Sequence, residues 1–416
     1  MKRVDILDAS LIFGSLSITQ VIILGILGVL ILAGLICLAI PTKKKTAITI
    51  FRVLVGALFI FSGFVKADDP LGFTYKLKEY FATDALNFPS MDKFSFSIAF
   101  VVPIIEMTLG FMILIGTRKM LTLTLIVAMM LFFTFLTWYT AHYNKVLECG
   151  CFGDAIPMTS WQSFWKNVVL MAFVIILLAG YKHITSPFTM KFQNISVLVF
   201  LVMATFFSWY CYNYLPVIDF RPYKIGTNIK KDMQGTPDVE KFYYSLKDKK
   251  TGITKEFDKF PENYQANYDY IGSRTEIVKK GVEPKIKDFS ISSASGNDVT
   301  DSILSVPGNH FILVCLSIDE ANKDEKVVNK INALASDCMK NHCGFICITA
   351  SDENAVSGYK KKFNPPYNFF TTDGTVLKTM IRSNPGLILI NSGVVKAMWH
   401  YHSIPSYSEV AETYFH

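Results

Sequence analysis

Long apolar runs fill the first half of the chain, whereas the second half alternates short apolar runs with stretches rich in Lys, Asp and Asn. A helix needs about 20 apolar residues to cross the hydrocarbon core of a bilayer. Six runs reach roughly that length, at residues 17–40, 46–65, 95–116, 119–141, 162–181 and 193–213. The pattern therefore predicts an α-helical membrane bundle of about six transmembrane helices, followed by a soluble part.

Lys and Arg collect in the short loops after the first, third and fifth runs, and the positive-inside rule assigns such loops to the cytoplasm. The residues are Lys43, Lys44, Lys45 and Arg52, then Arg118 and Lys119, then Lys182 and Lys191, with Lys2, Arg3, Lys76 and Lys78 running against the pattern. We therefore expect a multi-pass protein of a bacterial inner membrane, with everything after about residue 214 in the periplasm. The net charge of +7 is concentrated beside apolar runs and forms no aromatic-interleaved basic patch, so nucleic acid is not an expected partner.

The second half is predicted to hold two further modules. "KFYYSLKDKKTGITKEFDKF" alternates apolar and polar residues around a turn, which predicts a hairpin in a small β-rich module at 220–283, a spacer or docking surface. From 284 to 416, the strands "HFILVCLSI" and "GFICITAS" flank the helical pattern "EKVVNKINALASDCMKN", and an Asn-Ser-Gly turn joins two later strands. We therefore expect an α/β domain at 284–416.

A closely spaced cysteine pair, Cys149 and Cys151 in "ECGCFGD", follows the fourth apolar run on the expected outer side. That side is oxidising, where paired cysteines form disulfides or handle electrons. A single Gly between them permits a strained and readily reduced ring, which suits an electron relay. Two alternatives remain: a metal site with His142 and Glu148, although the spacing fits no common zinc pattern, and an incidental or structural pair.

Three charged residues lie in or beside the apolar runs. Glu106 falls near the middle of the third run, where an isolated carboxylate costs several kcal/mol and usually faces a partner or the bundle interior. Arg52 can snorkel to the cytoplasmic interface. Lys66 could lower the pKa of a nearby thiol if the loops converge, or could be a solvated surface lysine. Glu106 is therefore the third candidate catalytic residue beside the two cysteines.

Residues 46–181 resemble the DoxX/MauE family of four-helix membrane proteins, on the motifs "SGFVKADDP", "PIIEMTLGFMILIG" and "ECGCFGD". The family is similar to bundles of the vitamin K epoxide reductase and DsbB type, in which cysteines at a helix end exchange electrons with a partner thiol. The resemblance implies redox work for Cys149 and Cys151 and an exoplasmic client protein. A membrane quinone is the candidate cofactor, although no motif in the sequence identifies one. On this reading residues 1–45 are an N-terminal helix, and 182–219 a last helix with its exit linker.

Residues 284–410 resemble the TlpA/peroxiredoxin branch of thioredoxin-like domains, on "GVEPKIKDFSISSASGNDVTDSIL" and "NPGLILINSGVVKAMW". The resemblance implies that Pro385, in the position of a proline that is commonly cis, borders a client-binding site together with Asn384. The sequence departs from the family where Cys-x-x-Cys should stand, because it reads "LSIDEANKDEK" there and has no cysteine between Cys315 and Cys338. The standard thioredoxin mechanism cannot run without that thiolate.

The remaining cysteines and histidines admit plainer interpretations. Cys315 and Cys347 are expected to pack inside their strands. Cys338 and Cys343, on either side of "MKNH", could be a local disulfide, free thiols or an exchange pair with His342. His400 and His402 would share one face of a strand, which permits metal binding, but no third ligand is evident and we expect surface histidines.

Two functions from different classes are compatible with these patterns. The first is a membrane thiol–disulfide relay or maturation factor, with electrons passing through Cys149 and Cys151. The second is a non-enzymatic scaffold or assembly subunit whose thioredoxin-like domain binds a partner protein. The intact Cys-Gly-Cys loop favours the first, and the missing Cys-x-x-Cys favours the second.

Overall fold

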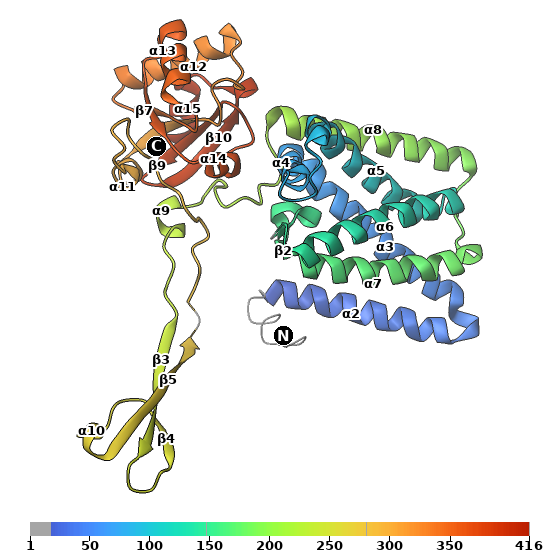
Figure 1. Cartoon of the computed structure of the whole chain (residues 1–416). Coiled ribbons are helices and arrows are strands. Elements are labelled where there is room, and N and C mark those ends of the chain that lie inside the picture. The colour runs from blue at the N-terminus through green and yellow to red at the C-terminus, as the bar shows by residue number, and fades with distance from the viewer. Residues whose placement is uncertain (1–17, 147, 280, 416) are drawn as a thin grey trace. The chain divides into compact units, whose positions relative to one another are not determined.

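The computed structural model describes residues 18–146, 148–279 and 281–415, and for residues 18–27, 30, 148, 149 and 279 it describes the backbone only (Figure 1). The chain divides into two compact units, and the division falls between Phe220 and Arg221. Each unit is described by itself below.

Unit 1 is a bundle of long helices joined by short connections. Its helices are α2 (Ile18–Ala39), η1 (Pro41–Lys43), α3 (Lys44–Asp68), α4 (Pro70–Phe81), η2 (Pro89–Phe94), α5 (Ser95–Ile115), α6 (Lys119–Tyr143), η3 (Gly150–Ala155), α7 (Ser160–Ala179), η4 (Tyr181–His183) and α8 (Met190–Tyr214). Figure 1 shows α2, α3 and α5 to α8 running alongside one another.

Five helices of the described part are long and apolar enough to cross a membrane: α3, α5, α6, α7 and α8. They correspond to five of the six predicted spans. The first predicted span forms α2, and most side chains of its first half lie outside the described residues. The chain is thus a multi-pass membrane protein.

Helices α3 and α5 approach each other closely at three glycines. A Cβ added to Gly63 would lie 2.8 Å from the carbonyl oxygen of Pro103, and one added to Gly110 would lie 2.8 Å from the carbonyl oxygen of Gly56. Small residues let helix backbones approach in this way when lipid supplies no hydrophobic driving force. The contact fixes how α3 and α5 are rotated toward each other, and that rotation positions the polar residues described below.

Unit 2 is built on a five-stranded mixed sheet in the order β10-β9-β6-β7-β8. The strands are β6 (Asn309–Cys315), β7 (Gly344–Thr349), β8 (Asn368–Thr371), β9 (Gly386–Asn391) and β10 (Val394–His400). β6, β7 and β8 are parallel, whereas β9 is antiparallel to β6 and to β10. The predicted Asn-Ser-Gly hairpin is confirmed, since Ser392 and Gly393 both have positive φ angles between β9 and β10.

Five helices accompany this sheet: α11 (Thr300–Leu304), α12 (Glu325–Lys340), α13 (Glu353–Phe363), α14 (Gly374–Met380) and α15 (Tyr407–Tyr414), with the short η5 (Tyr401–Ser403). The predicted helix between the first two strands is confirmed as α12. Its buried residues recur at helical spacing, and they are Val328, Ile331, Leu334, Ala335 and Cys338. The last four of these residues, from Ile331 to Cys338, pack with Phe311, Leu313 and Cys315 of β6 in one core, which explains why this helix covers the sheet.

A three-stranded antiparallel ribbon, β4-β3-β5, precedes the sheet in the chain. It comprises β3 (Val239–Asp248), β4 (Thr254–Phe257) and β5 (Tyr268–Lys279), with the one-turn helices α9 (Ile229–Asp232) and α10 (Tyr264–Asn267) nearby in sequence. β3 and β4 form the predicted hairpin.

The predicted boundary of this β-rich module at residue 220 differs from the structure. The backbone N–H of Gly226 donates to Val395, and that of Ile229 donates to Gly393. Residues 226–229 therefore pair along β10 at the edge of the five-stranded sheet, and the ribbon begins later, at Val239.

Candidate functional site

A buried ion pair joins α3 to α5. Lys66 Nζ lies 2.9 Å from Glu106 Oε2, and both side chains are almost inaccessible to solvent. The same ammonium donates to Ser62 Oγ at 2.7 Å and to the Ser62 carbonyl oxygen at 3.3 Å. Its three N–H donors thus all have acceptors, while the rings of Phe73 and Phe133 lie within 6 Å of it. The cation is fully compensated in a setting where an unpaired charge would be costly.

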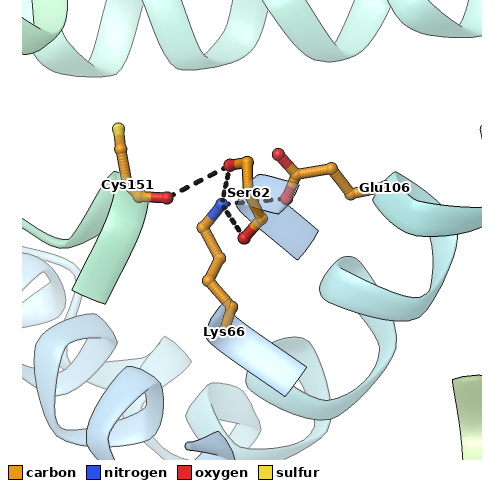
Figure 2. Close-up of polar contacts among 4 residues, drawn as sticks. All are labelled: Ser62, Lys66, Glu106 and Cys151. Carbon is orange, nitrogen blue, oxygen red and sulfur yellow. Dashed lines mark hydrogen bonds and ion pairs between the residues drawn. The ribbon is translucent and has the colours of Figure 1, made fainter. Parts of the chain in front are cut away.

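This ion pair is connected to the cysteine loop through one hydroxyl. Ser62 Oγ donates a hydrogen bond to the carbonyl oxygen of Cys151 at 3.1 Å while accepting one from Lys66 (Figure 2). In Figure 2 the sulfur of Cys151 points away from Ser62. The polar cluster therefore holds the backbone of the loop and does not contact the thiol.

The loop between α6 and α7 is anchored on several sides. β1 (Glu148–Cys149) pairs with β2 (Met158–Thr159), and Phe152 is buried with its ring 5.4 Å from that of Phe61. Gly150 lies against the Lys76 stem, where an added Cβ would be 2.8 Å from Lys76 Cγ. Gly153 has a φ of +49°, which glycine adopts without strain. The backbone around Cys151 is therefore held in one conformation.

The side chains of Cys149 and Glu148 lie outside the described residues. The proposed pairing of Cys149 with Cys151, and a metal site that would use Glu148, thus remain predictions. His142, the other ligand considered, stacks on Trp138 with ring centroids 5.4 Å apart. Among the residues that the structure does describe, no group of three or more His, Cys, Asp or Glu side chains could hold a metal ion.

The two ends of the bundle differ in charge. At one end, Arg52 Nη1 donates to the carbonyl oxygen of Thr185 at 2.9 Å and Lys119 Nζ donates to that of Ile184 at 3.2 Å. The positive loops singled out in the sequence therefore meet at the end where α3 begins. Lys66, Glu106 and the cysteine loop lie toward the end where α3 finishes.

Asp68 fixes the exit from the bundle at this second end. Its Oδ1 accepts hydrogen bonds from the backbone N–H of Val217 at 2.8 Å and of Ile218 at 3.2 Å, and Cys211 Sγ lies 3.6 Å away. Asp68 is buried, and its Oδ2 has no hydrogen-bond partner among the residues that the structure describes. The segment leaving α8 is thereby tied to the same end of α3 that carries Lys66.

One apolar hollow of about 380 Å³ opens on α8, lined by Met203, Phe206, Phe207 and Tyr210. Its single polar group is the Tyr210 phenol. Quinone carbonyls are recognised by hydrogen-bond donors, and this hollow offers one such group, the Tyr210 phenol. Thiol–disulfide exchange between a cysteine pair and another protein requires no quinone.

In unit 2 the peptide bond between Asn384 and Pro385 is cis. The Asn384 carbonyl accepts from the N–H of Asn322 at 3.0 Å, and Asn384 Nδ2 donates to the carbonyl oxygen of Ser317 at 3.0 Å. Pro385 is buried. The segment 317–322, which follows β6, is therefore bonded directly to Asn384, one of the two predicted client-binding residues.

The remaining predicted thiols and histidines are also located. Cys315 and Cys347 are buried in β6 and β7, as expected. A backbone hydrogen bond brings Cys338 and Cys343 together at the amino end of β7, whereas Asn384 and Pro385 lie at the carboxyl end of β6. The prediction of surface histidines is wrong for His400, which is only 3% exposed because it ends β10 facing the interior.

Sequence reasoning missed three residues of this arrangement. From the sequence, Lys66 is interpreted as a neighbour of a thiol or as a surface lysine. The overlooked signal is that Lys66 and Glu106 carry opposite charges on two helices that both contain small residues, which indicates an ion pair. Asp68 stands next to Asp69 at the end of an apolar run, where the sequence does not indicate its contact with Val217 and Ile218. Ser62 carried no signal, because a serine in an apolar helix commonly bonds its own backbone.

Comparisons with known proteins agree with the membrane assignment. Residues 44–180 match the family model described as "Methylamine utilisation protein MauE". The matched segment contains α3 to α7, and hence Lys66, Glu106 and the cysteine loop. No curated protein and no solved structure matches the chain.

Proposed function

We propose that unit 1 is a thiol–disulfide relay in which Cys149 and Cys151 exchange electrons with an exoplasmic client protein. The observation that carries the proposal is the hydrogen bond from Ser62 Oγ to the Cys151 carbonyl oxygen. It ties a cysteine loop at a helix end to a buried Lys–Glu pair in the membrane bundle. Intramembrane charges of this kind are costly and commonly serve a function.

The exchange balances with the client as the only redox partner. A client thiolate attacks one sulfur of a Cys149–Cys151 disulfide, which breaks the S–S bond and leaves a mixed disulfide and one cysteine thiolate. The second client thiolate attacks the mixed disulfide, forms the client disulfide and releases the reduced pair. Two electrons have then passed from client to pair, and the reverse sequence reduces a client. The direction follows the difference in reduction potential.

Within this reaction Ser62, Lys66 and Glu106 act as positioning residues. They hold the carbonyl of Cys151, so the loop backbone stays fixed while the S–S bond opens and closes. Phe152 and Gly150 hold the same loop from its other sides. A preorganised loop loses less conformational entropy when the mixed disulfide forms.

Alkylation of Cys149 and Cys151 in native membranes tests the relay. The pair should change redox state when membranes are poised at different ratios of reduced to oxidised dithiothreitol. A Cys151→Ala variant should accumulate mixed disulfides between Cys149 and client proteins, visible as adducts that reductant removes. Cys37→Ala is the matched control in another helix and should leave both results unchanged. A pair that keeps one redox state under all conditions would contradict the relay.

The relay also needs the cysteine loop and unit 2 on the exoplasmic side. The positively charged loops lie together at the end of the bundle opposite the cysteine loop, and this supports the orientation. Protease added outside spheroplasts should cut the exposed β3–β4 turn at Lys249 and Lys250, while inside-out vesicles should protect it. Cleavage from the cytoplasmic side would reverse the orientation and remove the oxidising compartment.

We further propose that unit 2 is a thioredoxin-like domain that holds the client beside Asn384 and Pro385. The strand order β10-β9-β6-β7-β8, the helix after β6 and the cis bond before β9 support the fold. Tethering in one chain raises the effective concentration of a bound client to roughly millimolar when the linker reaches, so a weak grip suffices. Asn322 and Ser317 occupy the carbonyl oxygen and Nδ2 of Asn384, whereas its Oδ1 has no hydrogen-bond partner in the described part of the chain and can accept a hydrogen bond from a client.

Client capture by paired variants tests this step. Asn384→Ala removes the hydrogen bond to Ser317 and should alter the yield of client adducts trapped on Cys149. Asn391→Ala removes a comparable hydrogen bond, to Asn309 at the opposite end of β6 and β9, and should not alter the yield. If both variants give equal yields of client adducts, the client does not bind beside Asn384 and Pro385.

Exposed apolar side chains on the ribbon favour a second candidate, a scaffold that docks a partner protein. Phe242, Ile277 and Val278 are each about half exposed or more, outside the membrane helices. If Cys149→Ser with Cys151→Ser retains full activity in cells while Phe242→Ser with Ile277→Ser does not, the scaffold replaces the relay.

A further inference from the structure

We propose that Cys338 and Cys343 form a second redox site, independent of Cys149 and Cys151, which takes an accessible disulfide as its substrate and closes to a Cys338–Cys343 bond. The proposal concerns unit 2 alone. It does not depend on the relay in unit 1.

The end of α12 brings the two cysteines together through its backbone. The N–H of Cys343 donates to the Cys338 carbonyl oxygen at 2.9 Å, and that of His342 donates to Met339 at 3.3 Å. His342 has a φ of +54°. This is a Schellman motif, in which the residue after the left-handed one packs its side chain against the third residue from the helix end. Those two positions are Cys343 and Cys338, so their thiols meet and form a hydrogen bond.

The two thiols differ in access and in polarity. Cys338 is fully buried in the core beneath the sheet, whereas Cys343 is partly exposed and its Sγ lies 3.1 Å from the carbonyl oxygen of Asn309. The hydrogen bond from the Cys338 thiol lowers the pKa of Cys343, and the same contact together with burial raises the pKa of Cys338. An incoming disulfide can therefore reach Cys343, while Cys338 is placed to attack the sulfur of Cys343 from within.

The reaction balances as an ordinary two-step exchange. The Cys343 thiolate attacks a disulfide R–S–S–R, which breaks that bond, forms a Cys343–S–S–R mixed disulfide and releases one R–S⁻. Cys338 then loses its proton and attacks the Cys343 sulfur, which forms the Cys338–Cys343 bond and releases the second R–S⁻. The substrate gains two electrons and the protein pair loses two. The backbone hydrogen bond between Cys343 and Cys338 keeps the two residues adjacent during both steps.

Two other cysteines of unit 2 lie away from this site, and Cys315, which the tested chain keeps, is the built-in control. Cys315 and Cys347 are buried in adjacent strands, and burial raises the pKa of Cys347 well above its usual range. Neither sits at a helix end or reaches the surface. They should not react with an external disulfide while the sheet stays folded.

The test uses the full chain in detergent, carrying Cys149→Ser, Cys151→Ser and Cys347→Ser, and oxidised glutathione as the disulfide. After exposure, free thiols are blocked and the chain is cut with trypsin. Cleavage after Lys340 separates the peptide with Cys338 from the peptide with Cys343, so only a disulfide keeps them joined. We expect the joined peptides, and in the reduced chain we expect a thiol-directed label to modify Cys343 at least about tenfold faster than Cys338.

Single variants establish the order of the two steps. Cys338→Ser should accumulate one glutathionyl group on Cys343, because nothing resolves the mixed disulfide, and Cys343→Ser should leave Cys338 unmodified. The joined peptides come from a chain in which both residues are native, so a folding defect in a single variant does not affect that result. Glutathione on both cysteines without an internal bond would overturn the proposal, and so would a pair that does not react at all.

Discussion

Lys66 on α3 and Glu106 on α5 form a buried ion pair at 2.9 Å that also holds Ser62, and through Ser62 the cysteine loop. Each charge is tolerated because the other is present. The pair therefore couples the packing of two membrane helices to the position of Cys151.

Removing one member of this pair should be much worse than removing both. Lys66→Met or Glu106→Leu leaves an uncompensated buried charge, which costs about 3–5 kcal/mol in comparable pairs. The double variant Lys66→Met with Glu106→Leu should recover most of that loss. The measure of stability is the temperature at which a thiol-directed reagent begins to label the buried Cys211, and mass spectrometry detects the labelled residue. Losses that simply add in the double variant would show that the two charges do not interact.

Glu106→Gln separates charge from shape. The amide can still accept a hydrogen bond from Lys66 but carries no charge, so insertion should be normal while stability and client exchange both fall. Lys78→Met is the matched control, because its ion pair with Asp92 lies at the surface and such pairs contribute about 0–1 kcal/mol.

Ser62→Ala should release the cysteine loop without unfolding the bundle. It removes the donor to the Cys151 carbonyl and one acceptor of Lys66, a net loss of roughly 1–3 kcal/mol at a buried site. The measurement is the rate of Cys151 alkylation in the reduced protein, which should rise as the loop loosens. Ser196→Ala is the control, since Ser196 bonds only backbone carbonyls of its own helix. An unchanged alkylation rate would mean that the hydrogen bond does not hold the loop.

The close approach of α3 and α5 predicts a steric effect at Gly63 and Gly110. An added methyl group at Gly63 would lie 2.6 Å from Met107 Cγ and 2.8 Å from the Pro103 carbonyl, so the helices must separate. Gly63→Ala should lower stability by about 1–3 kcal/mol, the usual cost of overpacking, and should weaken the link from Lys66 to Glu106. Gly28→Ala on α2 meets nothing within 4 Å and is the control. Equal stability of both variants would contradict this packing.

Local signals predicted much of the fold. The helical spacing in α12 and the Asn-Ser-Gly turn between β9 and β10 each depend on a few neighbouring residues. The pairing of Gly226 with Val395 could not be read in this way, because it joins residues 169 positions apart and depends on which sheet edge is open. Local patterns therefore did not indicate that residues 226–229 pair with β10.

The candidate site was predictable in part for the same reason. A lone carboxylate within an apolar helix indicated that Glu106 faces the interior, and it does. Lys66 sits near the end of its apolar run, where a solvated lysine is equally compatible with the sequence. Its pairing depends on the rotation that Gly63 imposes on α3, a tertiary effect that composition does not encode.

His400 predicts a pH dependence for unit 2. Burial, with a smaller contribution from His402, lowers the pKa of His400 to about 3, and burial also lowers the pKa of His310. Below an ordinary histidine pKa of about 6.5 the unfolded chain takes up protons that the folded chain refuses. Stability is therefore complete above about pH 6.5 and is lost as pH falls toward 3, by at most about 1.4 kcal/mol per pH unit for one histidine.

His400→Phe should flatten this dependence, because the buried ring then takes up no proton in either state. Pulse proteolysis of the full chain measures the urea concentration at which half of unit 2 is unfolded. Between about pH 7.5 and about pH 5, this midpoint should fall less in the variant than in the native chain. Staying above about pH 4.5 keeps Asp298 and Asp373 out of the measurement, since hydrogen bonds lower their pKa values. His402→Gln should retain most of the dependence, because His400 stays buried. If the native chain and His400→Phe lose the same stability over this interval, the acid sensitivity comes from other groups, with His310 the next to test.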